Sequence, residues 1–210
     1  TGGRQAALER WRLFKITGLS GYDVLRNHVD QKATSCLSPY LHFGHISTHE
    51  IVKEIFDHHE QTPDYLNLSK VDGRREGWWK MSAAVEAFLD QLIIWREIGF
   101  NRCANDPNFK SFNTLPQWSL TTLNKHRNDF RPYLYSIEDF EDALTHDSLW
   151  NAAQNQLKTE GVIHNYLRML WGKKILHWSE SPEQALDIMI ELNNKYALDG
   201  RNPNSYSGIF

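Results

Sequence analysis

The sequence is poor in cysteine and lacks the short motifs that mark common metal and phosphate sites. Cys36 and Cys103 are the only cysteines among 210 residues, too few for a disulfide framework or a cysteine metal site. No H-E-x-x-H segment occurs, nor a G-x-x-x-x-G-K-[ST] loop, nor a G-x-G-x-x-G turn after a strand. A zinc enzyme and a phosphate-loop enzyme are therefore not expected. The scarcity of cysteine favours a reducing compartment.

Long apolar runs and a strong charge bias are missing too. No apolar run reaches membrane-spanning length, and the chain does not open on a charged stretch followed by an apolar one. The net charge of -3 excludes a generally basic nucleic-acid-binding protein. It leaves room for a local basic groove, because binding depends on how the charge is distributed. The chain lacks an initiating Met and ends on "SYSGIF" without a helix stop, so we expect it to be a piece of a longer protein.

Helical periodicity, in contrast, recurs along most of the chain, and no run alternates as a strand. The sequence therefore predicts an all-α single domain over residues 1–210. Loops are expected at 62–63, 67–77 and 199–204, where turn formers gather, and residues 104–135 are expected to be irregular apart from one short helix. The predicted helices cover residues 4–16, a segment beginning at 47, and then 82–103, 119–127, 137–146, 147–161, 162–178 and 183–198.

Two of these helices have clear start signals, and a third has a strong apolar face. Ser47 and Glu50 form an S-x-x-E capping box, and Ser181 precedes Pro182 and Gln184 as an N-cap. The 82–103 helix is predicted to be central, because its apolar residues recur close to every 3.6 positions. Those residues are Val85, Phe88, Leu89, Leu92, Trp95 and Ile98.

The stretch "TSCLSPYLHFGHIS", residues 34–47, has two interpretations. Its hydroxyls and backbone N–H groups beside a proline-fixed turn can present donors to an anion. The same residues can also form an ordinary capping turn between helices. The tryptophans, eight in all, are equally open: large aromatics fill cores, but they also stack on flat ligands or bases.

The segment "IHNYLRMLWGKKILHW" is predicted to be a helix on which His164, Arg168 and Trp171 share one face. Trp178 lies two turns after Trp171, roughly 10 Å along the axis. A buried Arg168 needs a carboxylate partner, and the downstream candidates are Asp187 and Asp199. A packed amphipathic helix with a structural ion pair and a functional helix both fit this pattern.

Five segments taken together resemble a known family. They are "TSCLSPYLHFGHIS", "FLDQLIIWREIGFN", "LWNAAQ", "IHNYLRMLWGKKILHWS" and "YALDGRNPNSYSGIF". In this order, and over nearly the whole chain, they resemble the photolyase/cryptochrome family. The similarity is greatest to the class II cyclobutane pyrimidine dimer photolyases. One short motif would be weak evidence, whereas five in series are specific.

The resemblance implies the helical FAD-binding domain of a deoxyribodipyrimidine photo-lyase. In such an enzyme, reduced FAD excited by light donates an electron to a pyrimidine dimer flipped out of UV-damaged DNA, and the dimer then splits. The family's amino-terminal α/β antenna domain is not in this chain, and neither is the Trp expected after Phe210. The resemblance also implies a monomer in the cytosol, associated with DNA, or in the nucleus of a eukaryote.

The resemblance assigns cofactor contacts to both halves of the chain. The hydroxyls and amides of residues 34–38 would bind the pyrophosphate and ribitol, and Arg96 would lie near the phosphates or the DNA. Arg168 would pair with Asp199 beside the isoalloxazine, and Asn193 would lie near flavin N5, with Asp187 as a neighbour. The implied cofactor-binding residues are Tyr22, Thr34, Ser35, Cys36, Leu37, Ser38, Arg96, Arg168, Asn193, Asp199 and Arg201.

The resemblance also implies an electron relay and a lesion pocket. Trp171, Trp150 and Trp178, in that order outward, resemble the tryptophan relay that carries electrons to the excited flavin. The implied lesion-pocket residues are Gln91, Trp95, Asn165 and Met169. Candidates for a basic rim that contacts the DNA strand are Lys125, His126, Arg127 and Arg131.

Gln91 departs from the class II pattern, in which this position is a Glu that hydrogen-bonds the dimer. A glutamine amide is neutral and cannot give up a proton. Gln at this position is similar to (6-4) photolyases and animal cryptochromes, but His164-Asn165 lacks their paired histidines. The residue therefore leaves three alternatives: slower dimer repair, light sensing without repair, or a packing role in which Gln91 faces another polar group of the core.

Overall fold

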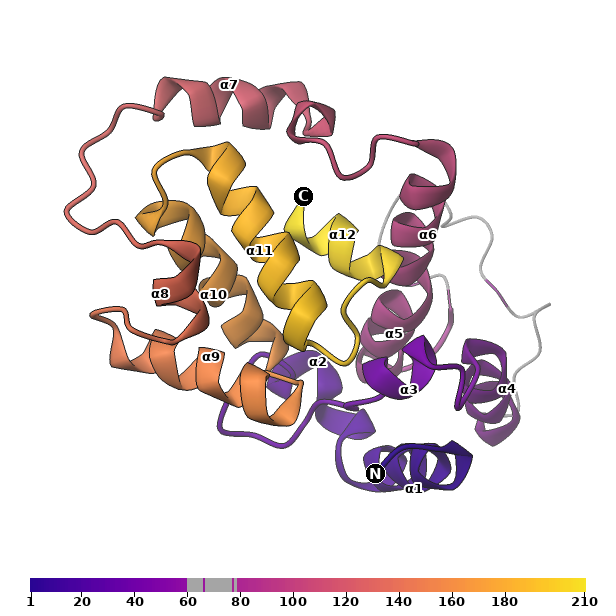
Figure 1. Cartoon of the computed structure of the whole chain (residues 1–210). Helices are drawn as coiled ribbons and strands as arrows, with labels where there is room; N and C mark the ends of the chain where they lie inside the picture. Colours follow the sequence, from indigo (N-terminus) through magenta and orange to yellow (C-terminus); the bar gives the residue numbers. More distant parts are fainter. Residues whose placement is uncertain (60–65, 67–76, 78) are drawn as a thin grey trace. The chain divides into compact units, whose positions relative to one another are not determined.

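The computed structural model describes residues 1–59, 66, 77 and 79–210, and this part of the chain is all-α, without strands, as predicted (Figure 1). The loops predicted at 62–63 and 67–76 lie outside the described residues. The chain divides into two compact units, Thr1–Glu97 and Ile98–Phe210. The single domain proposed for residues 1–210 stays a prediction. Among the described helices, none has the length and apolarity to cross a membrane.

The first unit is built on an aromatic core. Phe88 stacks on Trp11 with ring centroids 5.8 Å apart, and Phe14 and Tyr22 meet edge to face at 5.7 Å. Burial of such rings is the main stabilising contribution of a small helical unit. The helices around it are α1 (Arg4–Thr17), α2 (Tyr22–Leu25), α3 (Ser38–His42), α4 (Thr48–His58) and α5 (Ala83–Leu89), with η1 (Leu19–Gly21) before α2.

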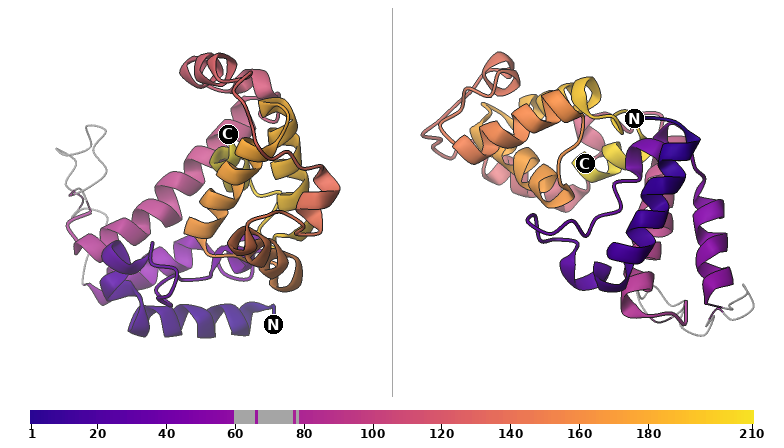
Figure 2. Two further views of the ribbon diagram at one scale, coloured as in Figure 1. Left: turned by 90° about the vertical axis from the view of Figure 1, so that its left-hand side faces the viewer. Right: turned by 90° about the horizontal axis from the view of Figure 1, so that it is seen from below.

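Polar contacts between side chains tie α1 to α4. Figure 2 shows the ribbon from two further sides. The indole N–H of Trp11 and the Nζ of Lys15 both donate to Glu54, at 2.9 and 2.6 Å. Ser47 caps α4 as predicted, accepting from the Glu50 N–H at 3.1 Å. The other half of the predicted capping box is replaced, because Arg4 binds the Glu50 carboxylate through both of its terminal nitrogens.

The helix predicted over 82–103 is interrupted by a wider turn. Ser82 caps α5, the π-helical turn η4 covers Asp90–Trp95, and α6 continues over Arg96–Asn105. A π turn closes i→i+5 hydrogen bonds, so it shifts the phase of every residue that follows. Leu89 and Leu92 are buried, but Trp95 and Ile98 are 45% and 48% exposed. The predicted apolar face is therefore wrong from Trp95 onward.

The second unit is built around three tryptophans, Trp150, Trp171 and Trp178, all nearly fully buried. The predicted helices are present as α7 (Gln117–Lys125), α8 (Ile137–Glu141), α9 (Ser148–Glu160), α10 (Asn165–Trp178) and α11 (Pro182–Tyr196), with η5 (Phe112–Thr114) before them. Helix α10 packs against α9 and α11 (Figure 1). Ser181 caps α11 by accepting from the Gln184 N–H at 3.2 Å, as predicted.

The structure corrects the sequence-based assignment at two helix ends. Helix α8 stops at Glu141, earlier than predicted, because Ala143 takes a positive φ of 56°. Helix α12 (Pro203–Ile209) begins inside the predicted loop 199–204. Asn202 accepts from the Asn204 N–H and Pro203 occupies the first turn, where a missing N–H costs nothing. The turn formers of this segment therefore serve as a helix start.

Gly99 allows the backbones of α6 and α12 to approach closely. A Cβ at this position would lie 2.8 Å from the backbone N and Cα of Asn204. Only glycine therefore fits between the two helices without moving them.

We expect Gly99→Ala to lower the free energy of unfolding by about 1–3 kcal/mol, because the two backbones must move apart. Urea unfolding measures this change. Gly208→Ala is the control, since nothing lies within 4 Å of its Cβ; equal effects of the two substitutions would contradict the close approach.

Candidate active site

Arg168 and Asp199 form an ion pair in the second unit. Arg168 Nη1 donates to Asp199 Oδ1 at 3.0 Å, and their side chains are 25% and 14% exposed. Asp187, the alternative partner, is exposed on α11. Between the two carboxylates that the sequence left open, the structure pairs Arg168 with Asp199. The predicted position of the pair beside a flavin stays a prediction.

The loop that carries Asp199 is held against the end of α11. The N–H of Arg201 donates to Asn194 Oδ1 at 2.8 Å, and Arg201 takes a left-handed φ of 60°. Gly200 is needed here, because a Cβ would lie 2.6 Å from the Asn193 carbonyl oxygen. The Ser205 hydroxyl donates to the Asp199 carbonyl at 3.0 Å. Asp199 is thus presented by a fixed backbone.

Three buried donor atoms in the described part of the second unit have no hydrogen-bond partner: Asn193 Nδ2, Arg168 Nε and His164 Nε2. His164 Nδ1 accepts from the Tyr166 N–H at 3.2 Å, and burial lowers the pKa of His164. The imidazole is therefore neutral near pH 7, with its proton on Nε2. Buried polar groups are normally hydrogen-bonded, so each of these three donors lacks a partner that it would normally have.

The three predicted relay tryptophans contact each other in series. Trp150 stacks on Trp171 with centroids 6.3 Å apart and ring planes 4° from parallel. Trp178 meets Trp150 edge to face at 6.1 Å. Their order in space, 171–150–178, follows the predicted order of the relay. All three are buried, Trp178 included, so the last ring does not reach solvent as a relay running outward would suggest.

Hydrogen bonds orient the first two indoles. Trp171 Nε1 donates to Gln154 Oε1 at 2.9 Å, and Trp150 Nε1 donates to the Trp171 carbonyl oxygen at 3.1 Å. Beyond Trp178 lies a polar pair, His146 and Tyr135. The Tyr135 hydroxyl and His146 Nδ1 are 2.7 Å apart, and the His146 ring lies 4.9 Å from Trp178. The tryptophan series therefore runs from a buried amide to a titratable pair.

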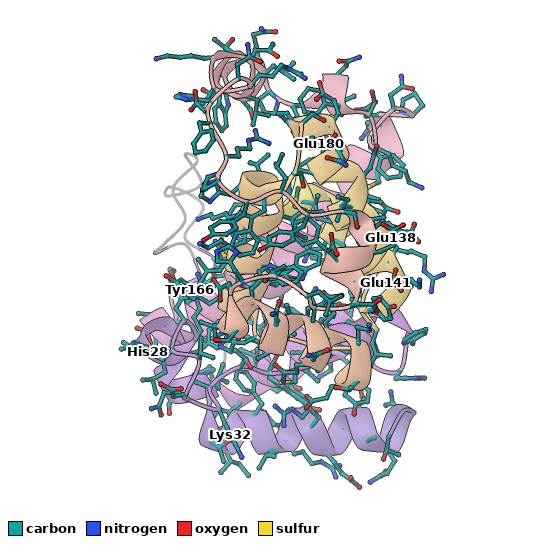
Figure 3. The ribbon with its side chains drawn as sticks, turned by 60° about the vertical axis from the view of Figure 1, so that its left-hand side comes forward. His28, Lys32, Glu138, Glu141, Tyr166 and Glu180 are labelled. Carbon is teal, nitrogen blue, oxygen red and sulfur yellow. The ribbon has the colours of Figure 1, made fainter. Side chains whose placement is uncertain are left out.

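Asn165 and Met169, two of the predicted lesion-pocket residues, are exposed on the first turns of α10. Tyr166, labelled in Figure 3, lies between them in sequence and is 43% exposed. Met169 is 51% exposed. This end of α10 presents an amide, a thioether and an aromatic ring to the outside of the second unit.

In the first unit, Arg10 of α1 anchors the predicted phosphate-binding segment. It donates to the carbonyl oxygens of Ser35, at 2.8 Å, and of Thr34, at 3.3 Å. Leu37 is buried, whereas Cys36 is exposed and takes a positive φ of 51°.

The hydroxyls of this segment are only partly used. Thr34 Oγ1 lies 3.6 Å from Cys36 Sγ, and Ser35 Oγ accepts from the Leu37 N–H at 3.4 Å. Ser38 begins α3 and is exposed. The backbone is thus fixed by its carbonyls and by Leu37, which leaves the Ser38 hydroxyl at the surface of the unit.

Tyr22, the other predicted cofactor contact of the first unit, is part of the core. Its ring meets Phe14 and Phe88 edge to face. Burial raises the pKa of the Tyr22 phenol. The Arg26 guanidinium lies 5.8 Å from the ring centroid. Packing against the core is therefore established for Tyr22, and contact with FAD stays a prediction.

The turn η4 gathers the residues predicted for the lesion pocket of the first unit around a buried carboxylate. Asp90 is 4% exposed. Its Oδ2 accepts from Gln91 Nε2 at 3.1 Å and from the Trp95 indole N–H at 3.0 Å. Arg96, the next residue, contacts Glu97 at 3.5 Å. Gln91 thus donates to a buried polar group, which is the contact that the packing alternative expects, and contact of Gln91 with a pyrimidine dimer stays a prediction.

The four candidates for a basic rim are mostly engaged in internal contacts. Arg127 pairs with Glu183, and Arg131 donates to the carbonyl oxygen of Ser179. His126 lies 2.8 Å from Asp129. Lys125 is exposed in the last turn of α7. The positive charge of this segment is therefore partly neutralised within the second unit.

Sequence reasoning missed Asp90 and Gln154, which orient the predicted residues. Both are buried polar side chains, and both lie within segments that resemble the family. A polar residue at a core position of a helix was the available signal, because such a residue must have a partner.

The described part of the chain is thus an all-α protein with a series of buried tryptophans and a set of buried donors that lack partners. No protein-family model matches it. Three deoxyribodipyrimidine photo-lyases are similar to it. Those of Potorous tridactylus and Arabidopsis thaliana are 39% identical over 87% and 93% of this chain, and that of Methanothermobacter thermautotrophicus is 38% identical over 99%. These matches cover 31%, 36% and 41% of the three relatives.

The chain belongs to the photolyase family. It spans only about a third to two fifths of the length of the curated relatives it matches. The activity in the names of these relatives is that of the whole proteins.

The ion pair provides a direct test of the site's construction. We expect Asp199→Asn to lower the free energy of unfolding by about 1–3 kcal/mol, because a partly buried charged hydrogen bond is lost. Asp187→Asn is the matched control; it is exposed on α11 and should change stability by less than about 0.5 kcal/mol. Urea unfolding of both variants measures the difference. Equal losses would show that the pair contributes nothing specific.

Proposed function

We propose that the chain is the FAD-binding portion of a DNA photolyase that repairs cyclobutane pyrimidine dimers in UV-damaged DNA. The observation that carries this proposal is the contact series Trp171–Trp150–Trp178 in a chain of this family. Electronic coupling falls steeply with distance, so stacked and edge-on indoles favour rapid electron transfer from ring to ring. A core that needed only volume would not require three tryptophans in one line.

The unpaired donors of the second unit fit a flavin ring. Asn193 Nδ2 and His164 Nε2 are neutral donors, while Arg168 adds a positive charge that Asp199 partly balances. An isoalloxazine offers ring nitrogens and carbonyl oxygens as acceptors, so a bound ring would satisfy such atoms. When reduced and excited by light, the bound flavin would supply the electron that splits a dimer. Asn193 would hold its amide toward the ring edge, and Arg168 would orient the ring.

Residues 34–38 would hold the phosphates and ribitol in this proposal. Arg10 keeps the carbonyls of Thr34 and Ser35 turned toward itself, which leaves amides and hydroxyls of the segment as donors. Hydroxyls and backbone N–H groups bind phosphate oxygens well. The capping alternative has support at both ends of the segment: Ser35 Oγ accepts from the Leu37 N–H directly before α3, and Ser47 caps α4.

Lesion binding would use the exposed residues Trp95, Met169 and Asn165, and the amide of Gln91. A damaged base pair costs little to unstack, and a flipped base is read by stacking and by hydrogen bonds to its edge. Lys125 is the candidate that best fits a phosphate contact, because the other three rim candidates already have partners. A monomeric state and a cytosolic or nuclear location stay predictions.

The alternative function is blue-light sensing by a cryptochrome-like flavoprotein without repair, or (6-4) lesion specificity. The observation that favours it is Gln91, which donates to Asp90 where class II enzymes present a carboxylate to the dimer. Both functions require bound FAD, so only a repair assay separates them.

The proposed activity is tested on the longest natural chain that contains this sequence. We expect the purified protein to be yellow with bound FAD and, once reduced and illuminated, to restore thymines in an oligonucleotide carrying one dimer. An oligonucleotide carrying a (6-4) product serves as the parallel substrate. Absence of flavin would refute the family-based proposal as a whole; flavin binding without repair of either lesion would favour light sensing.

Gln91→Glu tests the role of Gln91, the residue that differs from the class II pattern. We expect the yield of dimer splitting per absorbed photon to rise, because a carboxyl group can donate a hydrogen bond or a proton to the dimer radical anion and so stabilise it against return of the electron. The introduced carboxyl group would lie beside the buried Asp90 carboxylate, so its pKa should rise, which keeps the group partly protonated. The Gln91→Met variant, which removes the amide, is the control. An unchanged yield in Gln91→Glu would show that residue 91 does not face the dimer.

A further inference from the structure

Gln154 is a polar side chain at the centre of the second unit. It lies on α9 with 0% exposure and accepts the indole proton of Trp171 at 2.9 Å through Oε1. Burying an amide without need is costly. An apolar residue would fill the same space and leave only the Trp171 N–H to satisfy.

The orientation of the Gln154 amide is fixed from both ends. An indole N–H is only a donor, so the Gln154 oxygen must face Trp171. A backbone carbonyl is only an acceptor, so Nε2 must face the carbonyl oxygen of Glu141, 3.4 Å away. Glu141, labelled in Figure 3, ends α8, and Lys158 Nζ donates to the same carbonyl at 2.7 Å. The oxygen of Gln154 therefore cannot turn away from the indole.

We propose that Gln154 is a positioning residue that keeps the indole proton on Trp171 while this residue is oxidised, so that the electron vacancy moves on to Trp150. This inference rests on the proposed function, because it needs Trp171 to give up an electron. The oxidant would be excited flavin in its oxidised or one-electron-reduced state, since fully reduced flavin is an electron donor. Gln154 acts through Trp171, whose indole N–H its oxygen accepts, while its own amide is held by the Glu141 carbonyl.

Electrons and protons balance at each step of this transfer. Trp171 loses one electron to the flavin and becomes a radical cation, whose N–H is far more acidic than that of a neutral indole. The carbonyl oxygen of Gln154 is neutral and too weak a base to take that proton, so the positive charge stays on the ring. Trp150 then transfers an electron to Trp171 and Trp178 transfers one to Trp150, which leaves the vacancy on Trp178. The Trp150 N–H likewise faces a carbonyl oxygen, that of Trp171, so no proton leaves the first two rings.

A carboxylate at position 154 would change the outcome. The proton would pass from Trp171 Nε1 to the carboxylate, which leaves a neutral radical on Trp171 and a protonated carboxyl group. A neutral indolyl radical is a weaker oxidant than the radical cation. The electron would then not be drawn from Trp150, and the charge separation would collapse by direct return of the electron.

The surroundings of position 154 allow such a carboxyl group to titrate. Burial would raise its pKa above the ordinary value of about 4.3, and the Trp171 N–H would partly oppose that rise. The charged group nearest along the hydrogen bonds is Lys158 of α9, which donates to the same Glu141 carbonyl as Gln154. The Glu141 carboxylate accepts from Lys195 and Tyr196 of α11, and Asp142 contacts Lys158. At the far end of the tryptophan series, Trp178 is contacted by Lys174 of α10, by Tyr135 before α8 and by His146 before α9.

The test is Gln154→Glu in the flavin-loaded chain, followed by transient absorption between about pH 5 and pH 9. When the introduced carboxyl group is protonated, its carbonyl oxygen replaces that of the amide, and the long-lived tryptophan radical should form as in the parent chain. When it ionises, we expect the radical signal to change from the cation to the neutral form and the long-lived product to be lost. In the parent chain residue 154 is an amide that does not ionise, so the form and yield of the radical should not show this pH transition.

Gln156→Glu is the matched control. It introduces the same charge two residues along α9, where Gln156 donates to the Glu160 carboxylate away from the core. We expect its radical yield to follow pH as in the parent chain. A pH transition shared by both variants would overturn the proposal, since it would come from added charge alone.

A second measurement needs no flavin. Ultraviolet resonance Raman spectroscopy reports the hydrogen bond of an indole N–H, and subtracting the Trp171→Phe spectrum isolates Trp171. We expect the Trp171 hydrogen bond of Gln154→Glu to strengthen as pH rises, and that of the parent chain to stay constant. A bond that does not respond to pH in the folded variant would overturn the proposal.

Trp171→Phe in the flavin-loaded chain distinguishes failure of the proposed tryptophan relay from failure of the role proposed for Gln154. If photoreduction survives this change, the proposed relay itself fails. If Trp171→Phe abolishes photoreduction while Gln154→Glu yields the long-lived radical at every pH, the relay stands and the role assigned to Gln154 is wrong.

Discussion

The stacking of Trp150 on Trp171 is the contact on which the second unit depends. The two rings lie nearly parallel, and the Trp150 N–H reaches across to the Trp171 backbone, which fixes α9 on α10. Trp178 and Phe140 then close around Trp150. The rings that would carry electrons are therefore the same rings that fill the core. Any substitution in this series changes packing and electron transfer together, so each must be interpreted with a stability measurement beside it.

The unpaired donors give the second unit a different constraint. Asn193, Arg168 and His164 hold buried donor atoms without partners among the described residues, and each such atom costs roughly 1–3 kcal/mol of stability. A ligand that binds the folded state recovers this cost and adds a stabilisation that grows with its concentration. The second unit should therefore be more stable with a bound ligand that pairs these donors than without it.

The helix pattern could be predicted where local signals agree. Capping serines at 47 and 181 and the periodicity of α9 to α11 were sufficient to place these helices. The π turn η4 could not be predicted, because the residues of this segment fit an ordinary α-helix equally well. Helix α12 was hidden because Asn202 and Pro203 are typical both of turns and of helix starts.

The site was predictable only in part, for a related reason. The need of Arg168 for a carboxylate was visible in the sequence, but its choice of Asp199 over Asp187 depends on how the 199–201 loop folds back onto α11. Gln154 and Asp90 stand as polar residues at core positions of their helices, a signal that the sequence carries, but the sequence does not show which groups they bind. Local sequence indicates that a buried polar group needs a partner; tertiary packing decides which one.

The π turn at Asp90–Trp95 has a consequence for the side chains on either side of it. Such a turn holds one residue more than a turn of α-helix, so the helix changes phase without changing direction. Leu89 and Leu92 stay in the core, whereas Trp95 turns outward and keeps its indole N–H on the buried Asp90 carboxylate. One helix thus combines an apolar core face with an exposed aromatic ring whose orientation is set from inside the unit.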